Sequence, residues 1–274
     1  MKLSRVQVAP GSLLKCPHRL GVRTHDFQSC SRSSILLGGA PENTMFLHIE
    51  FVDLHSKNIS LKNTKELVSF WKSVKKDLES RVSHFESIKK NASDEEIFAE
   101  LSFCIFTPQS KALSCWQAVK SLDQKNLLLK ADALKLAKNI TGVRFHNNKA
   151  KYLVEARNLF TEKGKIKIKD KILSFENDFE LRKWLVANIK GFGYKEAAHF
   201  LRNIGMGQNL AILDRHILKN LCLFKAIDEV PETLTVKKYL EIEEKMNIFC
   251  KKVKIPMTHM DLLLWCMQTG GIFK

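Results

Sequence analysis

The sequence predicts an all-α protein of roughly ten helices, and three observations support this fold class. From about residue 62 almost to the end, apolar residues recur three and four positions apart, as on the buried face of a helix. Residues that favour helix N-caps precede these runs, and glycines that favour helix C-termini follow them. We expect each boundary to be correct to within ~2–4 residues.

Residues 1–44 differ in composition from the rest of the chain. They hold six Lys or Arg and two acidic residues, with Ser, Pro and Gly throughout and no sustained apolar periodicity. We expect this segment to be disordered. It is either a transit-like targeting peptide or the product of a start codon assigned too early, with Met45 as the true first residue. We favour the second interpretation.

The helical pattern begins near residue 62 with one apolar face. Its residues are Leu67, Phe70, Trp71, Val74 and Leu78. Ser93 with Glu96 forms a capping-box pattern at the start of a later helix, and Thr258 with Asp261 forms a variant of it. The glycines that follow periodic runs, as helix C-terminal glycines do, are Gly142, Gly205, Gly270 and Gly271.

One segment, Lys163 to Ile172, departs from the helical pattern because Lys alternates with Ile. A strand would need a partner, and we identify none for it. We therefore expect a solvated connection between helices.

The chain is strongly basic, with a formal net charge of +16. Lys and Arg that neutralise phosphates release counterions from nucleic acid, so we expect a polyanionic partner. Nucleic acid and an anionic membrane surface both suit the charge. No apolar run approaches the ~18 residues that a spanning helix needs, so the sequence reads as that of a soluble protein.

The seven cysteines are scattered and odd in number, as expected of reduced thiols. No Cys-x-x-Cys pair indicates zinc. Cys222, Cys250 and Cys266 lie 28 and 16 residues apart, too far for the closely spaced cluster that holds iron and sulfur. We therefore expect no iron–sulfur cluster and no other resident cofactor.

The segment from Leu185 to Ile204 contains two helical runs joined by the turn KGFGY at residues 190–194. This turn predicts a helix-hairpin-helix. Gly191 and Gly193 let the backbone approach a phosphate, and free amides at the start of the second helix point at it. Such a turn binds the DNA backbone without reading sequence. A packed corner between two helices is the alternative.

Lys195 lies in the first turn of the second helix, and Asp214 follows nineteen residues later. A lysine attacks a sugar carbon only as a neutral amine, and a helix N-terminus opposes its positive charge. The position therefore suits a nucleophile better than a structural cation. Asp214 precedes a predicted helix and is either its N-cap or a catalytic carboxylate.

Five segments carry a resemblance to a known family: KGFGYKEAAHFLRNIG (190–205), LAILDRHILKNL (210–221), GVRFHNNKAKYLVEARNL (142–159), FTPQSKA (106–112) and DLLLWCMQTGGIFK (261–274). The chain resembles the helix-hairpin-helix DNA glycosylases, and specifically the type 2 8-oxoguanine DNA glycosylase/AP lyases of archaea and some bacteria. The resemblance covers roughly residues 60–274.

The resemblance implies that Lys195 attacks C1′ of the damaged nucleotide, expels the base and forms a Schiff base, after which β-elimination cuts the strand. It implies that Asp214 helps to deprotonate the lysine and stabilises positive charge on the sugar. Trp265 would stack on the flipped base, and the C-terminal carboxylate of Lys274 would bind the guanine edge, which requires a free, unextended C-terminus. A core aromatic and a frayed tail are the structural alternatives for these two residues.

Weaker assignments come from loop position within the matched segments. Phe145 would cover the opposite face of the base, and Gln109 would fill the gap left in the duplex. Asp261 either touches the base or caps its helix. The residues expected to contact the DNA backbone are Lys190, Gly191, Gly193 and His216. His199 is expected to be packed, and the residues expected on a solvated basic face, with phosphate contact as the alternative, are Lys149, Lys151 and Arg157.

The resemblance also implies two helical lobes, one of residues 45–92 plus 190–274 and the other of residues 93–189, with DNA in the cleft between them. The partner would be double-stranded DNA containing 8-oxoguanine. The protein would act as a monomer and would not associate with a membrane. No metal is needed for lysine chemistry, although hairpin carbonyls can coordinate a monovalent cation. We expect the protein to act in the cytoplasm or nucleoid of a prokaryote. Targeting to an organelle by residues 1–44 stays an alternative.

Two other functions compete with this one. A glycosylase for another oxidised base would share the lysine and the aspartate, but it leaves the ending from Trp265 to Lys274 unexplained. A non-catalytic helix-hairpin-helix module would explain the charge and the turn. It gives no reason for Lys195 and Asp214 together.

Overall fold

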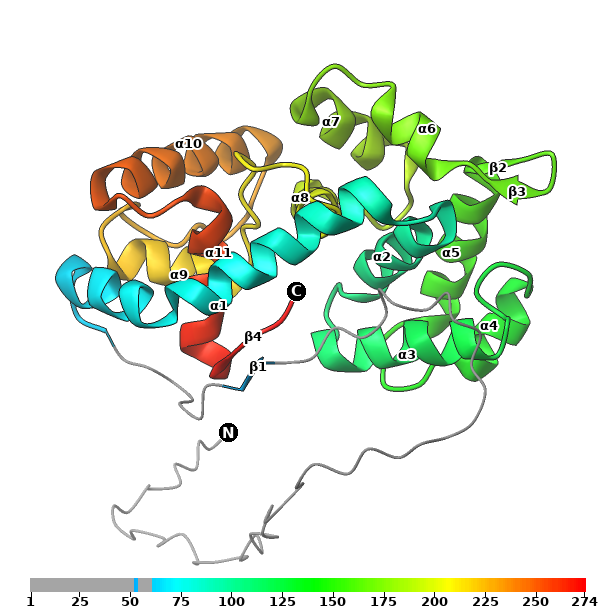
Figure 1. Cartoon of the computed structure of the whole chain (residues 1–274). Coiled ribbons are helices and arrows are strands. Elements are labelled where there is room, and N and C mark those ends of the chain that lie inside the picture. Colours follow the sequence, from blue (N-terminus) through cyan, green and yellow to red (C-terminus); the bar gives the residue numbers. More distant parts are fainter. Residues whose placement is uncertain (1–51, 54–60) are drawn as a thin grey trace, which may run out of the picture. The chain divides into compact units, whose positions relative to one another are not determined.

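Helices dominate the computed structural model, which describes residues 52–53 and 61–274 (Figure 1). The described residues form eleven helices: α1 (Thr64–Asn91), α2 (Asp94–Phe106), α3 (Ala112–Gln124), α4 (Ala133–Asn139), α5 (His146–Leu159), α6 (Ile168–Leu173), α7 (Asp178–Asn188), α8 (Tyr194–Asn203), α9 (Arg215–Leu223), α10 (Val236–Val253) and α11 (Met257–Thr269). The strands are β1 (Val52–Asp53), β2 (Thr161–Glu162), β3 (Lys165–Ile166) and β4 (Gly271–Ile272), with β1 antiparallel to β4 and β2 to β3. The predicted all-α class is confirmed.

The residues at helix ends follow the sequence pattern in one predicted case and depart from it in another. Ser93 caps α2 in a complete capping box, because its hydroxyl accepts from the Glu96 amide while the Glu96 carboxylate accepts from the Ser93 amide. The predicted cap at Thr258 is wrong. The last long helix begins one residue earlier, at Met257, and Pro256 precedes it without a side-chain cap.

The prediction of a solvated connection over Lys163 to Ile172 is also wrong. The segment contains β3, which pairs with β2 immediately before it, and then α6. Lys163 and Gly164 join the strands with φ of 49° and 77°, the left-handed pair that a two-residue hairpin turn requires. The isoleucines of the segment are buried in the core. The partner strand β2 lies directly before the segment in the sequence.

The buried side chains form two hydrophobic clusters. The first draws mainly on α2–α8, and the second on α1 and α9–α11. Phe273, near the end of the chain, belongs to the first cluster, whereas Ile272 belongs to the second. The predicted limits of the two lobes stay a prediction.

Helix α1 takes part in both clusters. Its ribbon runs from the region of α9 and α11 to that of α2 (Figure 1). Leu67, Leu78 and Phe85 contribute to the second cluster, and Ile88 contributes to the first. Gly205, which follows α8, lies directly against this helix: a Cβ there would be 2.5 Å from the Phe85 carbonyl oxygen. Because Gly205 also has φ of +71°, only glycine fits. The close contact fixes the helix that carries Lys195 against α1.

No helix among residues 61–274 is long and apolar enough to cross a membrane. Residues 1–44, whose disorder we predict from composition, lie outside the described residues.

Candidate active site

The predicted hairpin joins α7 to α8. Gly191 has φ of +85°, and a Cβ on it would lie 2.9 Å from the Tyr152 ring, so the turn needs glycine here. Phe192 is buried in the first cluster and anchors the turn. Gly193 is the N-cap of α8, and its amide donates to the Glu196 carboxylate at 3.1 Å. The helix-hairpin-helix prediction is confirmed.

Lys190 lies on the outside of this turn. Its ammonium is 2.9 Å from the Glu155 carboxylate, and its side chain remains 64% exposed. The hydrogen bond from Lys190 to Glu155 raises the pKa of the lysine. Lys190 and the exposed backbone at Gly191 are therefore open to a partner in solution.

Lys195 is the second residue of α8, and its side chain is 24% exposed. Its Nζ lies 3.5 Å from Oε1 of Glu196, whose other oxygen accepts the hairpin amide of Gly193. The amine therefore sits beside a helix N-terminus, near a carboxylate and within reach of solvent. The sequence interpretation missed Glu196, although the third position of a helix often carries the glutamate of a capping box.

Asp214 caps the N-terminus of α9. Its Oδ1 accepts from the amides of His216 and Ile217, both at 2.8 Å, so the structural alternative for this residue is realised. The side chain is partly exposed. Both hydrogen bonds use one oxygen, which leaves Oδ2 available for another partner. His216, two residues after Asp214, is exposed.

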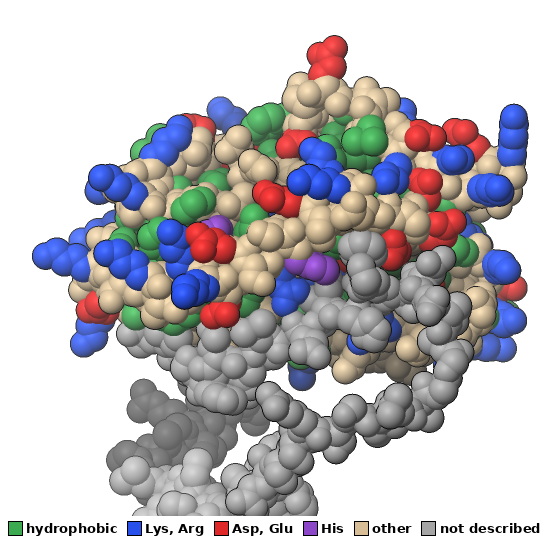
Figure 2. All heavy atoms as spheres, in the orientation of Figure 1, with side chains coloured by type: hydrophobic (Ala, Val, Ile, Leu, Met, Phe, Trp, Pro, Cys, Tyr) green, Lys and Arg blue, Asp and Glu red, His purple; other side chains and the backbone are tan. Residues whose placement is uncertain are grey.

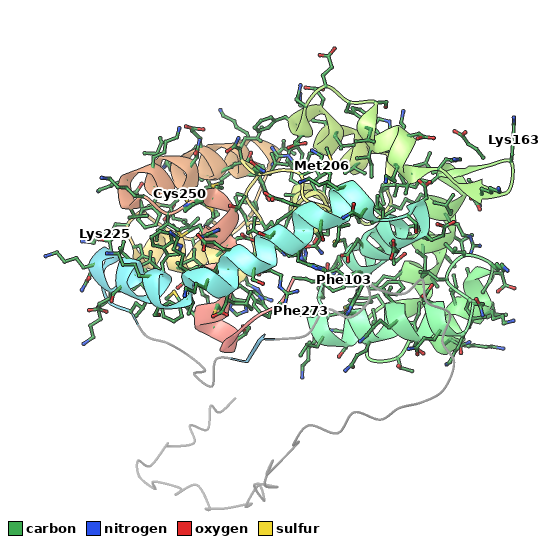
Figure 3. The ribbon with its side chains drawn as sticks, in the orientation of Figure 1. Phe103, Lys163, Met206, Lys225, Cys250 and Phe273 are labelled. Atoms are coloured by element: carbon green, nitrogen blue, oxygen red, sulfur yellow. The ribbon has the colours of Figure 1, made fainter. Side chains whose placement is uncertain are left out.

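The end of the chain is folded into the protein. Phe273 points toward Phe103, with ring centroids 6.3 Å apart (Figure 3). The side chain of Lys274 is fully buried, pairs with Glu100 and lies over the Trp116 ring. Burial lowers the pKa of Lys274 to about 8, against the raising effect of Glu100. The alternative of a frayed tail is therefore wrong.

A chain of buried polar groups extends from Glu100 to the helix that carries Trp265. Glu100 accepts from Asn203 at 3.1 Å, Arg202 donates to Asn203 at 3.1 Å, and Arg202 also pairs with Asp261. Asp261 thus does not cap its helix. Burial raises the pKa of Asp261, Arg202 opposes that shift, and the charge of Asp214 adds to it.

Trp265 lies one helical turn beyond Asp261 and is half-buried against the first cluster. It is thus neither a fully buried core aromatic nor free in solution. Its indole has one part available to a stacking partner. The role expected for it stays a prediction.

His199 lies one turn after Lys195 on the same face of α8. It is buried, and its ring packs edge-on against Phe103 with centroids 5.4 Å apart. Neither ring nitrogen meets a partner in regular hydrogen-bond geometry among the described residues, although the Lys274 backbone lies close enough to favour the charged form of the ring. Burial holds the pKa of His199 well below its usual range, and the charges of Arg202 and Lys195 add to this shift. The imidazole is therefore neutral, in agreement with a packed residue.

Gln109 and Phe145 lie on two loops in the left-handed region, with φ of 56° and 57°. Both are exposed, Phe145 by 55%, and the Arg144 guanidinium lies 5.6 Å from its ring. For residues other than glycine this backbone conformation is strained and requires support. Neighbouring structure must therefore hold both loops.

Lys149 provides that support. Its ammonium donates to the carbonyls of Phe106 and Pro108 at 2.7 and 2.6 Å and to the Ser110 hydroxyl at 3.1 Å. Ser110 in turn accepts the Arg144 amide at 3.0 Å. Burial lowers the pKa of Lys149. The prediction of a solvated Lys149 is wrong, and no signal in the sequence indicated this contact.

The other residues of the predicted basic face are more open. Lys151 is exposed, whereas Arg157 is partly buried and donates to the Leu128 carbonyl at 3.2 Å. Across residues 61–274, no group of His, Cys, Asp and Glu side chains is arranged to hold a metal ion.

A family model described as 8-oxoguanine DNA glycosylase matches residues 78–255. A Fusobacterium nucleatum protein named 8-oxoguanine DNA glycosylase/AP lyase is 50% identical over 209 residues, which cover 76% of this chain and 96% of that protein. A protein of the same name from Methanocaldococcus jannaschii is 40% identical over 201 residues, covering 73% and 93% of the two chains.

Solved structures agree with these matches. The Methanocaldococcus jannaschii 8-oxoguanine glycosylase/lyase, solved in complex with 15mer DNA containing 8-oxoguanine, has a TM-score of 0.68 and 37% identity, over 76% of this chain and 100% of that chain. The 8-oxoguanine DNA glycosylase of Thermotoga maritima has a TM-score of 0.68 and 30% identity, over 77% and 98%.

Proposed function

This chain belongs to the 8-oxoguanine DNA glycosylase family, and from this premise we propose that it removes 8-oxoguanine from DNA and then cuts the strand at the resulting site. The observation that carries the proposal is the partly exposed Lys195 in the first turn of α8, directly after a hairpin that presents backbone amides. The matches in sequence and structure extend over the whole of this region.

Lys195 acts as the nucleophile. Its neutral amine attacks C1′ of the damaged nucleotide, and the glycosidic bond breaks as the base leaves with the bonding electrons. The nitrogen then loses one proton, the C1′–O4′ bond breaks as O4′ takes up a proton, and a protonated Schiff base joins Nζ and C1′. Removal of a C2′ proton then expels the 3′ phosphate by β-elimination. Glu196, 3.5 Å from Nζ, is placed to hold the lysine side chain in the site.

Asp214 supports both stages through its charge. The carboxylate is held in place by the two amides that Oδ1 accepts, so it needs little reorganisation when positive charge develops on the sugar. Its free Oδ2 takes up a proton from the attacking amine. The helix cap and the catalytic role therefore use different oxygens of the same side chain.

The flipped base is read by the C-terminal part of the chain. Trp265 stacks on one face, Phe145 covers the other, and the backbone carboxylate of Lys274 accepts hydrogen bonds from the guanine edge. The pair between Lys274 and Glu100 positions that carboxylate. Asp261 acts at a distance from the base, by holding Arg202.

Duplex DNA is the partner, and its backbone is held at the hairpin. The amide at Gly191, together with Lys190 and His216, binds phosphates without reading sequence, while the Gly193 amide donates to Glu196 and holds the start of α8. Gln109, exposed at the tip of its loop, fills the space that the flipped nucleotide leaves in the stack.

Borohydride trapping tests the proposal. The full chain is incubated with a duplex carrying one 8-oxoguanine opposite cytosine, and a reduced protein–DNA adduct is expected. Lys195→Gln should abolish the adduct and nearly all turnover while leaving duplex binding largely intact. Lys183→Gln, an exposed lysine paired with Glu180 on α7, is the matched control and should retain both.

Two outcomes would overturn the proposal. An adduct with duplexes carrying another oxidised base but none with 8-oxoguanine would indicate a glycosylase for a different lesion. Binding of the duplex without an adduct or a nick would indicate a binding module.

A further inference from the structure

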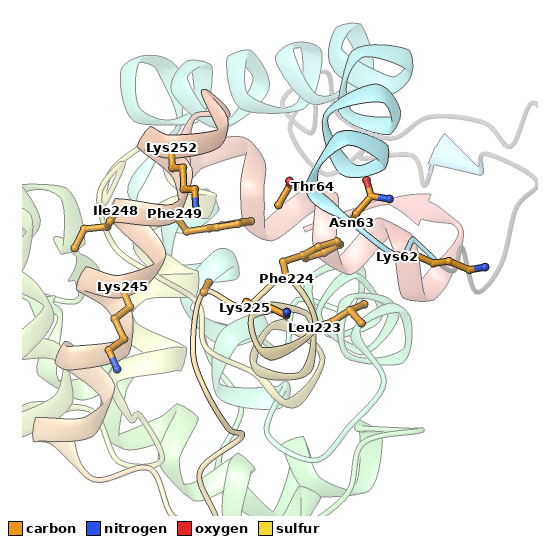
Figure 4. Close-up of a pocket in the computed structure, with 11 residues that line it drawn as sticks. Lys62, Asn63, Thr64, Leu223, Phe224, Lys225, Lys245, Ile248, Phe249 and Lys252 are labelled. Carbon is orange, nitrogen blue, oxygen red and sulfur yellow. The ribbon is translucent and has the colours of Figure 1, made fainter.

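A pocket of about 490 Å³ opens where α1 begins, away from the residues assigned to base excision (Figure 4). It lies between the residues around Asn63, the C-terminal end of α9 and the last turns of α10. Asp214 caps the opposite end of α9, and nine helical residues separate the two ends by about 13 Å. The proposed lysine chemistry gives this pocket no role.

The floor of the pocket is aromatic. Phe224 and Phe249 stack with ring centroids 6.3 Å apart and an interplanar angle of 16°. Beside them, Leu223 and Ile248 are 51% and 56% exposed. Large apolar side chains that remain in water around a concave site gain free energy when an apolar group covers them. The floor therefore suits a partner that inserts an apolar side chain.

The walls of the pocket are basic. Lys62, Lys225, Lys245 and Lys252 line it, and no acidic residue does. Among the described residues, Lys245 alone of these four forms an ion pair, with Glu241 at 3.2 Å. Figure 2 shows several Lys and Arg side chains on this end of the molecule, with Asp and Glu side chains among them. The pocket thus combines an apolar floor with positive charge that the described residues leave largely uncompensated.

We propose that this pocket binds an acidic segment of another protein, in which carboxylates flank a large apolar side chain. The carboxylates pair with the lysines while the apolar side chain packs against the exposed Leu223 and Ile248, above the buried Phe224 and Phe249. A DNA backbone would satisfy the lysines but leave Leu223 and Ile248 in water.

Two occupants from within this protein carry the wrong charge. Residues 1–44 hold six basic and two acidic residues, and a second copy carries a net charge of +16. Compared with these two occupants and a DNA backbone, an acidic protein partner is the one that matches both the floor and the walls.

The test uses a short fluorescein-labelled peptide in which Glu and Asp flank a central Leu-Phe pair, titrated with the full chain by fluorescence anisotropy. We expect saturable binding that weakens by more than about tenfold in the double variant Lys225→Glu, Lys252→Glu. Lys163→Glu, at the tip of the β2–β3 hairpin, is the charge-reversal control and should bind the peptide normally (Figure 3). Excision of 8-oxoguanine should be unchanged in both.

A second pair of variants covers the case in which the double variant does not fold, because Lys225 has φ of +57°. Lys252→Glu and Ile248→Ser change exposed residues of a regular helix, and each should weaken the peptide by itself. Circular dichroism establishes that each variant is folded.

Several results would overturn the proposal. They are no peptide binding, equal binding by the double variant and the Lys163 control, or equal binding of a peptide whose Leu-Phe pair is replaced by serines. Loss of affinity for undamaged duplex in the double variant, with peptide binding intact, would make the pocket a DNA contact. A dimer that the double variant loses would make it a contact between copies of this chain.

Discussion

The hairpin turn and the C-terminal segment hold their functional groups by different physical means. At the hairpin, the left-handed Gly191 and the capped start of α8 place backbone amides, and the Lys190 side chain faces solvent. At the C-terminus, Lys274 is held by a buried pair with Glu100, within a set of polar groups that reaches Asp261. The hairpin depends on local conformation, whereas the C-terminal segment depends on partners far away in sequence.

The largest expected effect is that of Asp214→Asn, which distinguishes the capping role of Oδ1 from the catalytic role of Oδ2. Asn is as good an N-cap as Asp, so Asp214→Asn should change the unfolding free energy by less than about 0.5 kcal/mol. Without the charge, turnover should fall by about 10²–10⁴-fold. Chemical denaturation and single-turnover excision measure the two effects. If the Asn variant cuts DNA normally, Asp214 is a cap and nothing more.

Breaking the buried pair should destabilise the C-terminal region. Glu100→Leu leaves the Lys274 ammonium buried without a carboxylate and should lower the unfolding free energy by about 3–5 kcal/mol. Urea denaturation measures this loss. The double variant Glu100→Leu, Lys274→Met removes both charges and should recover most of it. A double variant as unstable as the single one would mean that packing, and not charge, holds this region.

The same pair predicts a pH dependence. Burial lowers the pKa of Lys274 to about 8 in the folded protein. In the unfolded chain the pKa is ~10.4. Between these values the unfolded chain binds a proton that the folded protein does not, so the free energy of unfolding should rise with pH, by about 3 kcal/mol in total. Below pH 8 both states are charged, and the contribution of Lys274 is constant.

The measurement compares the unfolding free energies of the parent chain and Lys274→Met from pH 7 upward. The unfolding free energy of the parent minus that of Lys274→Met should increase as the pH rises. A constant difference would show that Lys274 titrates at its ordinary pKa despite its burial.

The smallest expected effect tests the hairpin. Gly191→Ala and Gly164→Ala both place alanine at positive φ, which should cost about 1 kcal/mol in each case. Only at Gly191 does the new Cβ meet a neighbour, the Tyr152 ring at 2.9 Å, and this should add about 1–3 kcal/mol. Thermal denaturation of the pair isolates the close approach. Equal losses would mean that the turn tolerates a side chain.

Local features of the site could be predicted from the sequence. The Gly-x-Gly turn, the capping box at Ser93 and the position of Asp214 before a helix each depend on residues within a few positions of one another. The turn between β2 and β3 was equally local. It was missed because Lys163 stands where Asn or Asp usually marks such a turn.

Contacts between distant residues could not be predicted in this way. Lys149 reaches carbonyls 41 and 43 residues away, and Lys274 pairs with a glutamate 174 residues away. The sequence does not distinguish a buried lysine from a solvated one, because burial follows from tertiary packing. The sequence pattern therefore located the lysine and aspartate of the site, while the groups that hold its loops and its C-terminal segment required the structure.

The passage of α1 through both hydrophobic clusters has a consequence for unfolding. Neither cluster can separate without uncovering part of the same helix, and the contact of Gly205 with the Phe85 carbonyl adds a backbone restraint between them. Residues 61–274 should therefore melt in one calorimetric transition, with equal calorimetric and van't Hoff enthalpies. A destabilising substitution in either cluster would then lower the single melting temperature of residues 61–274.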